Sequence, residues 1–179
     1  MPTLTEPRQL FLHKLGDVYT AEKTIVQMLP RLQQEARDEK LVEGLKKHLE
    51  QSRKHVENVE KVFQEFGAQP EARPCPGIEG IKREHDQSVG EVSPQMVDLF
   101  AAGAATSTEH YEIANYEGLI AMAKALNKPQ AARLLETNMK QDQKMLTETK
   151  AIARRLSTKA AKQAGFSGQR TKSRSATRR

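Results

Sequence analysis

The chain is poor in the residues that build β-sheets and disulfide frameworks. It contains no tryptophan and one cysteine, Cys75, and aromatic residues make up only 4% of its 179 positions. A single cysteine excludes an internal disulfide, which is compatible with a reducing compartment. No run of about 18 apolar residues occurs, so the sequence predicts no membrane-spanning helix. Residues 1–8 hold two prolines and no apolar signal core, so we expect no secretory leader and a cytoplasmic location.

Charge is abundant but unevenly distributed. Charged residues make up 29% of the chain, and the net charge is +6. From Ser157 onward the sequence holds no acidic residue and seven basic ones, which are Lys159, Lys162, Arg170, Lys172, Arg174, Arg178 and Arg179. Without these seven charges, residues 1–156 carry a net charge of −1. We therefore expect one folded domain over residues 1–156, followed by a basic, disordered tail over residues 157–179.

Four long segments have apolar residues at alternating steps of three and four, which is typical of amphipathic helices. Asp38 is a candidate N-cap, and Gly67 is a favourable helix end. Pro30 lies inside the first segment, and we expect it to kink that helix rather than end it. Ser93 and Pro94 are suited to begin the third helix. The four segments span Thr5–Ala36, Glu39–Phe66, Ser93–Leu126 and Pro129–Leu156.

The lengths of the connections predict how these helices are arranged. The first and second helices are joined tightly, as are the third and fourth, so each pair is expected to be antiparallel. Residues 67–93 form a much longer link, rich in proline and glycine, with one short helix expected over residues 78–87. A long crossover lets the second and third helices run in the same direction. The sequence thus predicts an all-α, ferritin-like four-helix bundle.

Carboxylates stand in line with the apolar stripes of these helices. Glu22 lies between Val18 and Ile25, and Glu50 lies at the flank of the second stripe. A charged carboxylate that faces a core costs several kcal/mol, on the order of 3–5, unless it is paired or binds a cation. Several such residues on facing helices indicate a metal site inside the bundle. The candidate ligands are Glu22, Glu50, Glu109, Glu112 and Asp142.

Three stretches of sequence resemble the YciE/YciF family of bacterial ferritin-like proteins. They are Leu15-Gly-Asp-Val-Tyr-Thr-Ala-Glu-Lys23, His48-Leu-Glu50 and Glu109-His-Tyr-Glu-Ile-Ala114, and the likeness covers roughly residues 8–156. The resemblance implies a bundle that is often dimeric and is associated with bacterial stress responses, so we expect a homodimer. It also implies a dinuclear centre of iron or manganese that handles Fe(II) or peroxide.

The resemblance extends to the ligand pattern of rubrerythrin-like proteins, with departures. That pattern implies Glu22 on the first helix and Glu109-x-x-Glu112 on the third. On the second helix Glu50 matches, but Arg53 stands where the pattern has histidine. On the fourth, Asp142 replaces glutamate and Met145 replaces histidine. Hard oxygen donors suit Fe or Mn, whereas imidazole ligands are expected to be absent.

Two interpretations therefore remain open, and whether the chain is an enzyme is open with them. In the first, the five carboxylates hold a dinuclear metal centre. In the second, the positive charge of Arg53 neutralises them, and the protein is a dimeric structural or binding module. His48 and His55 could be ligands from the second helix, but we interpret them as surface or interfacial residues. Tyr19, Tyr111 and Tyr116 are interpreted as bundle-filling, with one a candidate to hydrogen-bond a ligand. Residues Lys159–Arg179 could bind DNA or RNA non-specifically, or serve only solubility.

Overall fold

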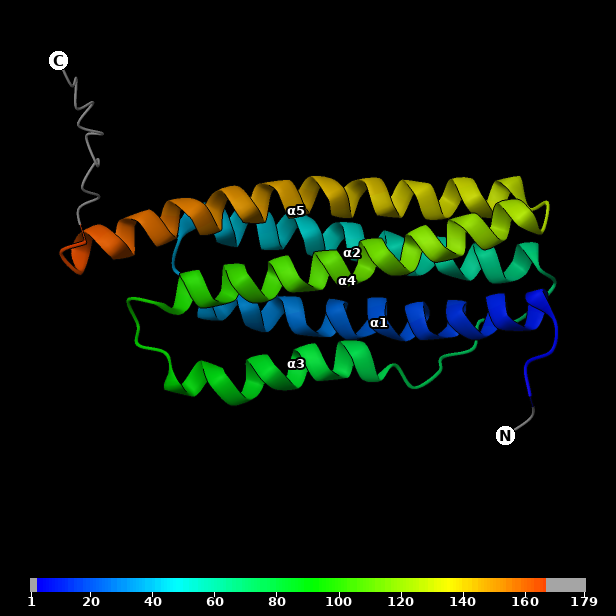
Figure 1. Ribbon diagram of the computed structural model, residues 1–179, viewed down its shortest axis with the longest axis horizontal. Coiled ribbons are helices and arrows are strands. Elements are labelled where there is room, and N and C mark those ends of the chain that lie inside the picture. Colours follow the sequence, from blue (N-terminus) through cyan, green and yellow to red (C-terminus); the bar gives the residue numbers. More distant parts are fainter. Residues whose placement is uncertain (1–2, 167–179) are drawn as a thin grey trace, which may run out of the picture.

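The computed structural model describes residues 3–166 of the chain. These residues form five α-helices, four of them long, and one short 3-10 turn (Figure 1). Among the described residues, no helix combines the length and the apolar character needed to cross a membrane. The helices are α1 (Pro7–Glu35), α2 (Glu39–Glu65), α3 (Pro76–Ser88), α4 (Val97–Ala125) and α5 (Pro129–Gln163), with the 3-10 turn η1 (Val89–Glu91) after α3.

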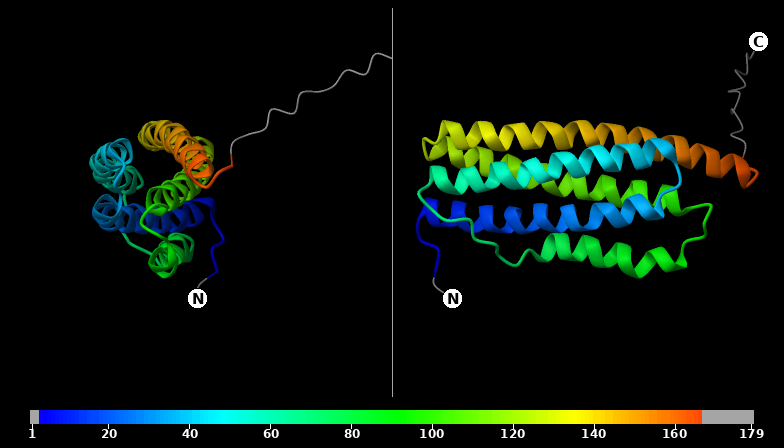
Figure 2. Two further views of the ribbon diagram at one scale, coloured as in Figure 1. Left: turned by 90° about the vertical axis from the view of Figure 1, so that its left-hand side faces the viewer. Right: turned by 180° about the vertical axis from the view of Figure 1, so that it is seen from behind.

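The four long helices pack as the predicted ferritin-like bundle. Short turns make α1 antiparallel to α2, and α4 antiparallel to α5 (Figure 1). The crossover that carries α3 runs back along the outside of the bundle, so α4 starts at the same end as α2 and runs parallel to it (Figure 2). Because α3 packs on α1 and α4, it covers one side of the bundle and leaves the four-helix core intact.

Local sequence signals explain most helix ends. The Asp38 side chain accepts a hydrogen bond from the backbone N–H of Leu41 at 3.2 Å, which confirms it as the N-cap of α2. Gly67 follows α2 with a φ of 64°, a left-handed conformation that glycine adopts without strain. Helix α1 continues through Pro30, as expected from the stripe that persists beyond it.

Two helix boundaries differ from the sequence prediction by more than two residues. Helix α4 begins at Val97, because residues 93–96 form a turn in which the Met96 N–H donates to the Ser93 carbonyl. Helix α5 runs to Gln163, so the predicted start of the tail after Leu156 is wrong for residues 157–163. Their alanines and lysines favour helix, and the helix ends before Gly165, whose φ is 82°. The predicted disorder of residues 167–179 lies outside the described part of the chain.

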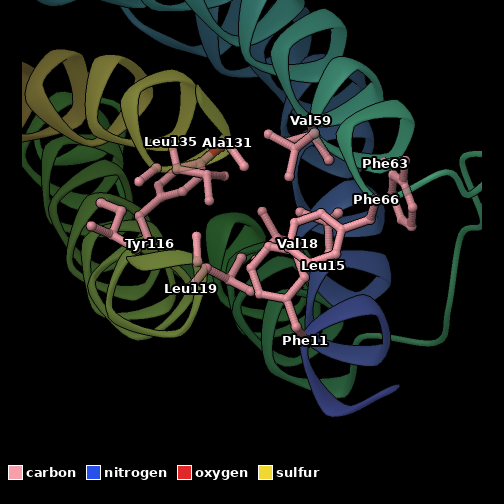
Figure 3. Packing of buried hydrophobic residues seen from close by; sticks show 14 of the residues in the cluster. Phe11, Leu15, Val18, Val59, Phe63, Phe66, Tyr116, Leu119, Ala131 and Leu135 are labelled. Atoms are coloured by element: carbon pink, nitrogen blue, oxygen red, sulfur yellow. The ribbon is translucent and has the colours of Figure 1, made fainter. Parts of the chain in front are cut away.

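The core consists of two apolar layers with a polar layer between them. At one end of the bundle, Phe11 stacks on Phe66 with ring centroids 4.3 Å apart, and Leu15, Val59 and Leu135 belong to the same apolar cluster (Figure 3). The layer at the other end takes residues from all five helices, and includes Ile25, Leu29, Leu32, Leu41, Leu45 and Ile152. Each fully buried aliphatic side chain contributes about 1.5–3 kcal/mol. The two layers thus hold the polar side chains between them away from water.

Candidate metal centre

Each long helix contributes at least one charged or titratable side chain to this polar layer. The contributions are Glu22 from α1, His48 and His55 from α2, Glu109 and Glu112 from α4, and Asp142 from α5. All six residues are buried, and none is more than 3% exposed. Such burial of four carboxyl groups is costly unless the site binds cations or the groups take up protons.

The helical period explains why these residues meet. Glu109 and Glu112 are three residues apart and therefore share one face of α4. His48 and His55 are seven residues apart, which is close to two helical turns and about 10 Å along α2. Ser52 lies between them on the same face and is completely buried. A single face of α2 therefore presents two imidazoles to carboxylates of the other three helices.

The six side chains form two adjoining sets of donors. Glu22, His55 and Glu112 form one set, and His48, Glu109 and Asp142 form the other. Within each set the potential ligand atoms all lie within 4.8 Å of one another. This is the spacing expected of groups that can converge on one ion.

Close contacts between nitrogen and oxygen atoms join the two sets. His55 Nδ1 lies 3.2 Å from Glu22 Oε1 in its own set and 3.6 Å from Asp142 Oδ1 in the other. His48 Nε2 lies 3.3 Å from Glu109 Oε1 and 3.9 Å from Glu112 Oε2. The six side chains therefore make a single cluster that consists of two neighbouring donor sets.

Most donor atoms of the cluster have no hydrogen-bond partner within residues 3–166. The atoms without a partner are Glu22 Oε2, both ring nitrogens of His48, His55 Nδ1, Glu109 Oε2, and both carboxyl oxygens of Glu112 and of Asp142. A buried polar group without a partner costs about 1–3 kcal/mol, and a charged one costs more. So many unpartnered atoms at one place fit a site built to be completed by metal ions.

The electrostatics of the cluster oppose charge on its carboxyl groups in the absence of cations. Burial, followed by the charges of Asp142 and Glu22, raises the pKa of Glu109 to about 10. Burial also raises the pKa of Asp142 to about 8, with His55 acting against it, and raises that of Glu112 well above its ordinary value. Burial and mutual repulsion therefore oppose the ionisation of these three groups without metal, and divalent ions would have to compete with protons for them.

The two histidines respond to the cluster in opposite ways. Burial, aided by the nearby positive charge of His55, lowers the pKa of His48 to about 3, so its imidazole is neutral. Burial also disfavours the charged form of His55, but the carboxylates of Glu22 and Asp142 outweigh it and raise its pKa to about 9. His55 Nε2 contacts Gln141 Oε1 at 3.0 Å, which leaves Nδ1 directed at the carboxylates. Such a contact is how proteins orient an imidazole ligand.

A chain of buried hydrogen bonds holds Glu22 in place. Asn138 Nδ2 donates to the backbone carbonyl of His55 at 3.3 Å and to the Tyr116 hydroxyl oxygen at 3.0 Å. Since the carbonyl can only accept, the amide NH₂ of Asn138 must face both groups. The Tyr116 hydroxyl therefore donates its proton to Glu22 Oε1. Asn58 Nδ2 completes the chain by donating to Asn138 Oδ1 at 2.8 Å. Of the three tyrosines, Tyr116 is thus the one that contacts a candidate ligand.

The structure brings together four of the five predicted ligands but not the fifth. Glu22, Glu109, Glu112 and Asp142 converge in the cluster. The Glu50 side chain is 68% exposed and pairs with Arg53 Nη1 at 3.0 Å on the surface, so its assignment to this site is corrected. The predicted surface position of His48 and His55 is also wrong, since both are buried.

The error on α2 is one of register. The pair that faces the interior is Ser52-x-x-His55, two residues beyond the predicted Glu50-x-x-Arg53. Ser52 belongs to the apolar stripe that also contains Leu45 and Leu49, and His48 and His55 lie four residues before and three residues after it. Helical spacing from Ser52 could therefore have placed both histidines on the buried face.

The donor inventory equals that of dinuclear carboxylate centres in four-helix bundles, although the donors are distributed differently. Such centres use four carboxylates and two histidines, with the histidines on two different helices. Here both imidazoles come from α2, and α5 carries Met145, which is 1% exposed, three residues after Asp142. Four carboxylates match the charge of two divalent cations. The residues present therefore fit a dinuclear metal centre.

Comparison with known proteins identifies the relatives of this chain. Residues 6–162 match the family described as a domain of unknown function, DUF892. The protein YciF of Escherichia coli K12 is 30% identical over 135 residues, which are 74% of this chain and 81% of YciF.

Two solved structures share the fold closely. The Escherichia coli stress protein YciF has a TM-score of 0.82 at 27% identity, covering 87% of this chain and 99% of its own. YcfI from Rhodopseudomonas palustris has a TM-score of 0.80 at 35% identity, covering 82% of this chain and 94% of its own. The chain therefore belongs to the DUF892 family, and it is a ferritin-like bundle of the YciE/YciF type.

Proposed function

We propose that this protein binds two iron or manganese ions in the cluster between its four long helices. In this proposal Glu22, His55 and Glu112 hold one ion, and His48, Glu109 and Asp142 hold the other. The observation that carries the proposal is the set of buried donor atoms without partners, contributed by all four helices. Two divalent cations would satisfy these atoms and balance the charge of the four carboxylates together.

The chemistry of the donors favours iron or manganese over softer metals. Carboxylate oxygens suit hard ions, and imidazole adds affinity for iron. The thiol of Cys75 contacts the Tyr111 hydroxyl at 2.9 Å and is not a member of either donor set. A site without thiolates and with four carboxylates is poorly matched to a structural zinc site or to Cu(I).

When bound, a pair of iron or manganese ions supplies redox chemistry toward peroxide or oxygen. The surrounding residues would support this role by excluding water and by fixing the ligands. Tyr116 and Asn138 orient Glu22, and Gln141 orients His55. Because its relative in Escherichia coli is described as a stress protein, we extend the proposal to the handling of Fe(II) or peroxide under stress.

The alternative, in which Arg53 neutralises the buried carboxylates, does not agree with the position of Arg53. It required Arg53 to pair with the carboxylates of the core, but Arg53 pairs with Glu50 on the surface. Within residues 3–166, no lysine or arginine forms an ion pair with Glu22, Glu109, Glu112 or Asp142. The structure thus favours a metal-binding cluster over one that is internally neutralised by fixed positive charge.

Metal stoichiometry tests this proposal. The purified chain is reconstituted with Fe(II) or Mn(II) without oxygen, and its metal content is measured by mass spectrometry. We expect about two ions per chain, a loss of metal in Glu112→Gln, and full content in the surface control Glu50→Gln. Equal metal content in wild type and Glu112→Gln would contradict the assignment, as would a loss in the control.

A further inference from the structure

The end of α5 extends beyond the bundle and is unusually basic. Its last buried apolar contacts come from Ile152 and Leu156, and none of the described residues after Leu156 is buried. Figures 1 and 2 show this last part of α5, in orange, projecting past the ends of the neighbouring helices. No acidic residue follows Glu148 in the sequence. The projecting helix therefore presents positive charge where packing does not require it.

A cleft of about 700 Å³ lies where this helix end meets two other segments. It is lined by the turn between α1 and α2, by the residues before and at the start of α4, and by the end of α5. A second, shallower hollow on the adjoining face of α5 shares Arg155, Lys159 and Gln163 with it. The two hollows thus form one continuous surface at this end of the molecule.

The cations of this surface are available, whereas two of its three acids are already engaged. Asp38 accepts from Arg155 Nη2 at 2.6 Å, and Asp98 accepts from the backbone N–H groups of Arg37 and Asp38. Only Glu39 lacks such a partner among the residues that the structure describes. Among the residues that line the two hollows, five exposed cations form no ion pair within residues 3–166. We call them the basic surface, and they are Arg37, Lys40, Arg154, Lys159 and Lys162.

We propose that the basic surface binds the phosphate backbone of nucleic acid without sequence preference. Lysine and arginine, with the hydroxyl and amide groups of Ser157, Thr158 and Gln163, are the donors that proteins use for phosphate oxygens. In the sequence, residues 167–179 add five basic residues and no acidic one, which can raise the avidity for an extended polyanion.

The composition of the surface favours nucleic acid over a membrane. Residues 157–163 read Ser-Thr-Lys-Ala-Ala-Lys-Gln and contain no large apolar side chain to insert among lipids. Phe166, which is 76% exposed, is a single aromatic side chain at the end of α5. One ring provides little stacking along a strand, so the binding energy must come from the phosphates. Binding should accordingly be strongly dependent on salt.

Fluorescence anisotropy with the full chain tests this inference. Two labelled DNA duplexes of unrelated sequence are titrated over a range of salt concentrations. We compare wild type with Lys159→Glu/Lys162→Glu and with a control of equal charge change, Lys46→Glu/Lys61→Glu. The control lysines are exposed on α2, and they form no ion pair within residues 3–166. Neither pair of substitutions touches the core or the metal centre.

We expect wild type to bind both duplexes equally and the α5 variant to lose at least ten-fold in affinity while the control keeps it. Loss of two phosphate contacts should reduce the slope of log affinity against log salt by about 1.8. Anionic lipid vesicles are titrated against the same proteins. An equal loss in the control, a sequence preference, or binding to the vesicles but to neither duplex would each overturn the proposal. Metal content is measured in parallel, so that failure of the nucleic-acid proposal can be distinguished from failure of the metal proposal.

Discussion

Replacing Glu109 with glutamine should stabilise the metal-free protein and destabilise the metal-loaded one. Glutamine has nearly the same shape as the protonated glutamate but cannot ionise. Glu109 is 1% exposed, and burial with its acidic neighbours raises its pKa from 4.5 to about 10. The side chain is therefore neutral in the folded, metal-free protein at pH 7, and the substitution should leave that state almost unchanged.

The magnitude follows from the difference in protonation between the folded and unfolded chains. Above pH 4.5 the unfolded glutamate has lost its proton, whereas the folded one keeps it until about pH 10. Folding must then take up a proton, so the free energy of unfolding falls as pH rises by about 1.4 kcal/mol per pH unit. Between pH 6 and pH 8 the wild type should lose roughly 2.7 kcal/mol relative to Glu109→Gln. For a chain of this size that is roughly 5–11 °C in melting temperature.

Metal binding should act against this difference. In the proposed centre, iron or manganese would bind the ionised carboxylate and would stabilise the wild type by about 2.7 kcal/mol when the free ion is at 100 times its dissociation constant. Glutamine cannot supply that ligand, so the variant should gain much less from the same ion. At pH 6, which is 1.5 units above 4.5, the metal-free wild type should be only about 2 kcal/mol less stable than the variant. At that pH we expect the melting curves of the two proteins to exchange order when Mn(II) is added.

Thermal unfolding followed by circular dichroism measures both effects at several pH values, with and without Mn(II). The reasoning is refuted if Glu109→Gln is less stable than wild type in chelator at pH 8. That result would mean that the carboxylate is ionised and satisfactorily paired within the protein, for example by His48, whose Nε2 lies 3.3 Å from Glu109 Oε1.

Three further predictions concern positions around the site. His48→Met should lose one of the two metal ions in the stoichiometry assay. Adding Met145→His should restore that ion, since position 145 shares a face of α5 with the ligand Asp142. Equal metal content in the single and double variants would contradict the proposed assignment of ligands. Tyr116→Phe should weaken Mn(II) binding and cost about 1.5–3 kcal/mol of stability in urea titrations, because it removes a hydrogen bond to a carboxylate; unchanged affinity would mean that the hydroxyl does not position its partner. Gly77→Ala should lower the free energy of unfolding by about 1–3 kcal/mol, because the added carbon would lie 2.6 Å from the Tyr111 ring. Wild-type stability in the same urea titration would show that the crossover adjusts freely to the added carbon.

The fold was largely predictable because the stripes and turns act locally. Asp38 and Gly67 mark helix ends through their own side-chain and backbone chemistry, and the long link containing Pro70 and Pro74 requires a crossover. The end of α5 was missed because helix can continue after burial ends when Ala and Lys favour it. The expected homodimer depends on surfaces that a single chain does not test, and it stays a prediction.

The candidate site was predictable on three helices and misplaced on the fourth. Glu22, Glu109 and Glu112 lie in line with apolar neighbours, so periodicity alone directs them inward. On α2 the family pattern favoured Glu50, whereas the buried face carries Ser52, which is four residues after His48 and three before His55. A one-step or two-step error in helical register turns a ligand outward by roughly 100–200°. The structure resolves this ambiguity because the surrounding helices decide which face is buried.

Anomalous diffraction from crystals of the protein grown with Mn(II) tests the central claim most directly. The account predicts two peaks inside the bundle, one among Glu22, His55 and Glu112 and the other among His48, Glu109 and Asp142. The account is contradicted if the core shows no peak at a Mn(II) concentration that occupies surface sites.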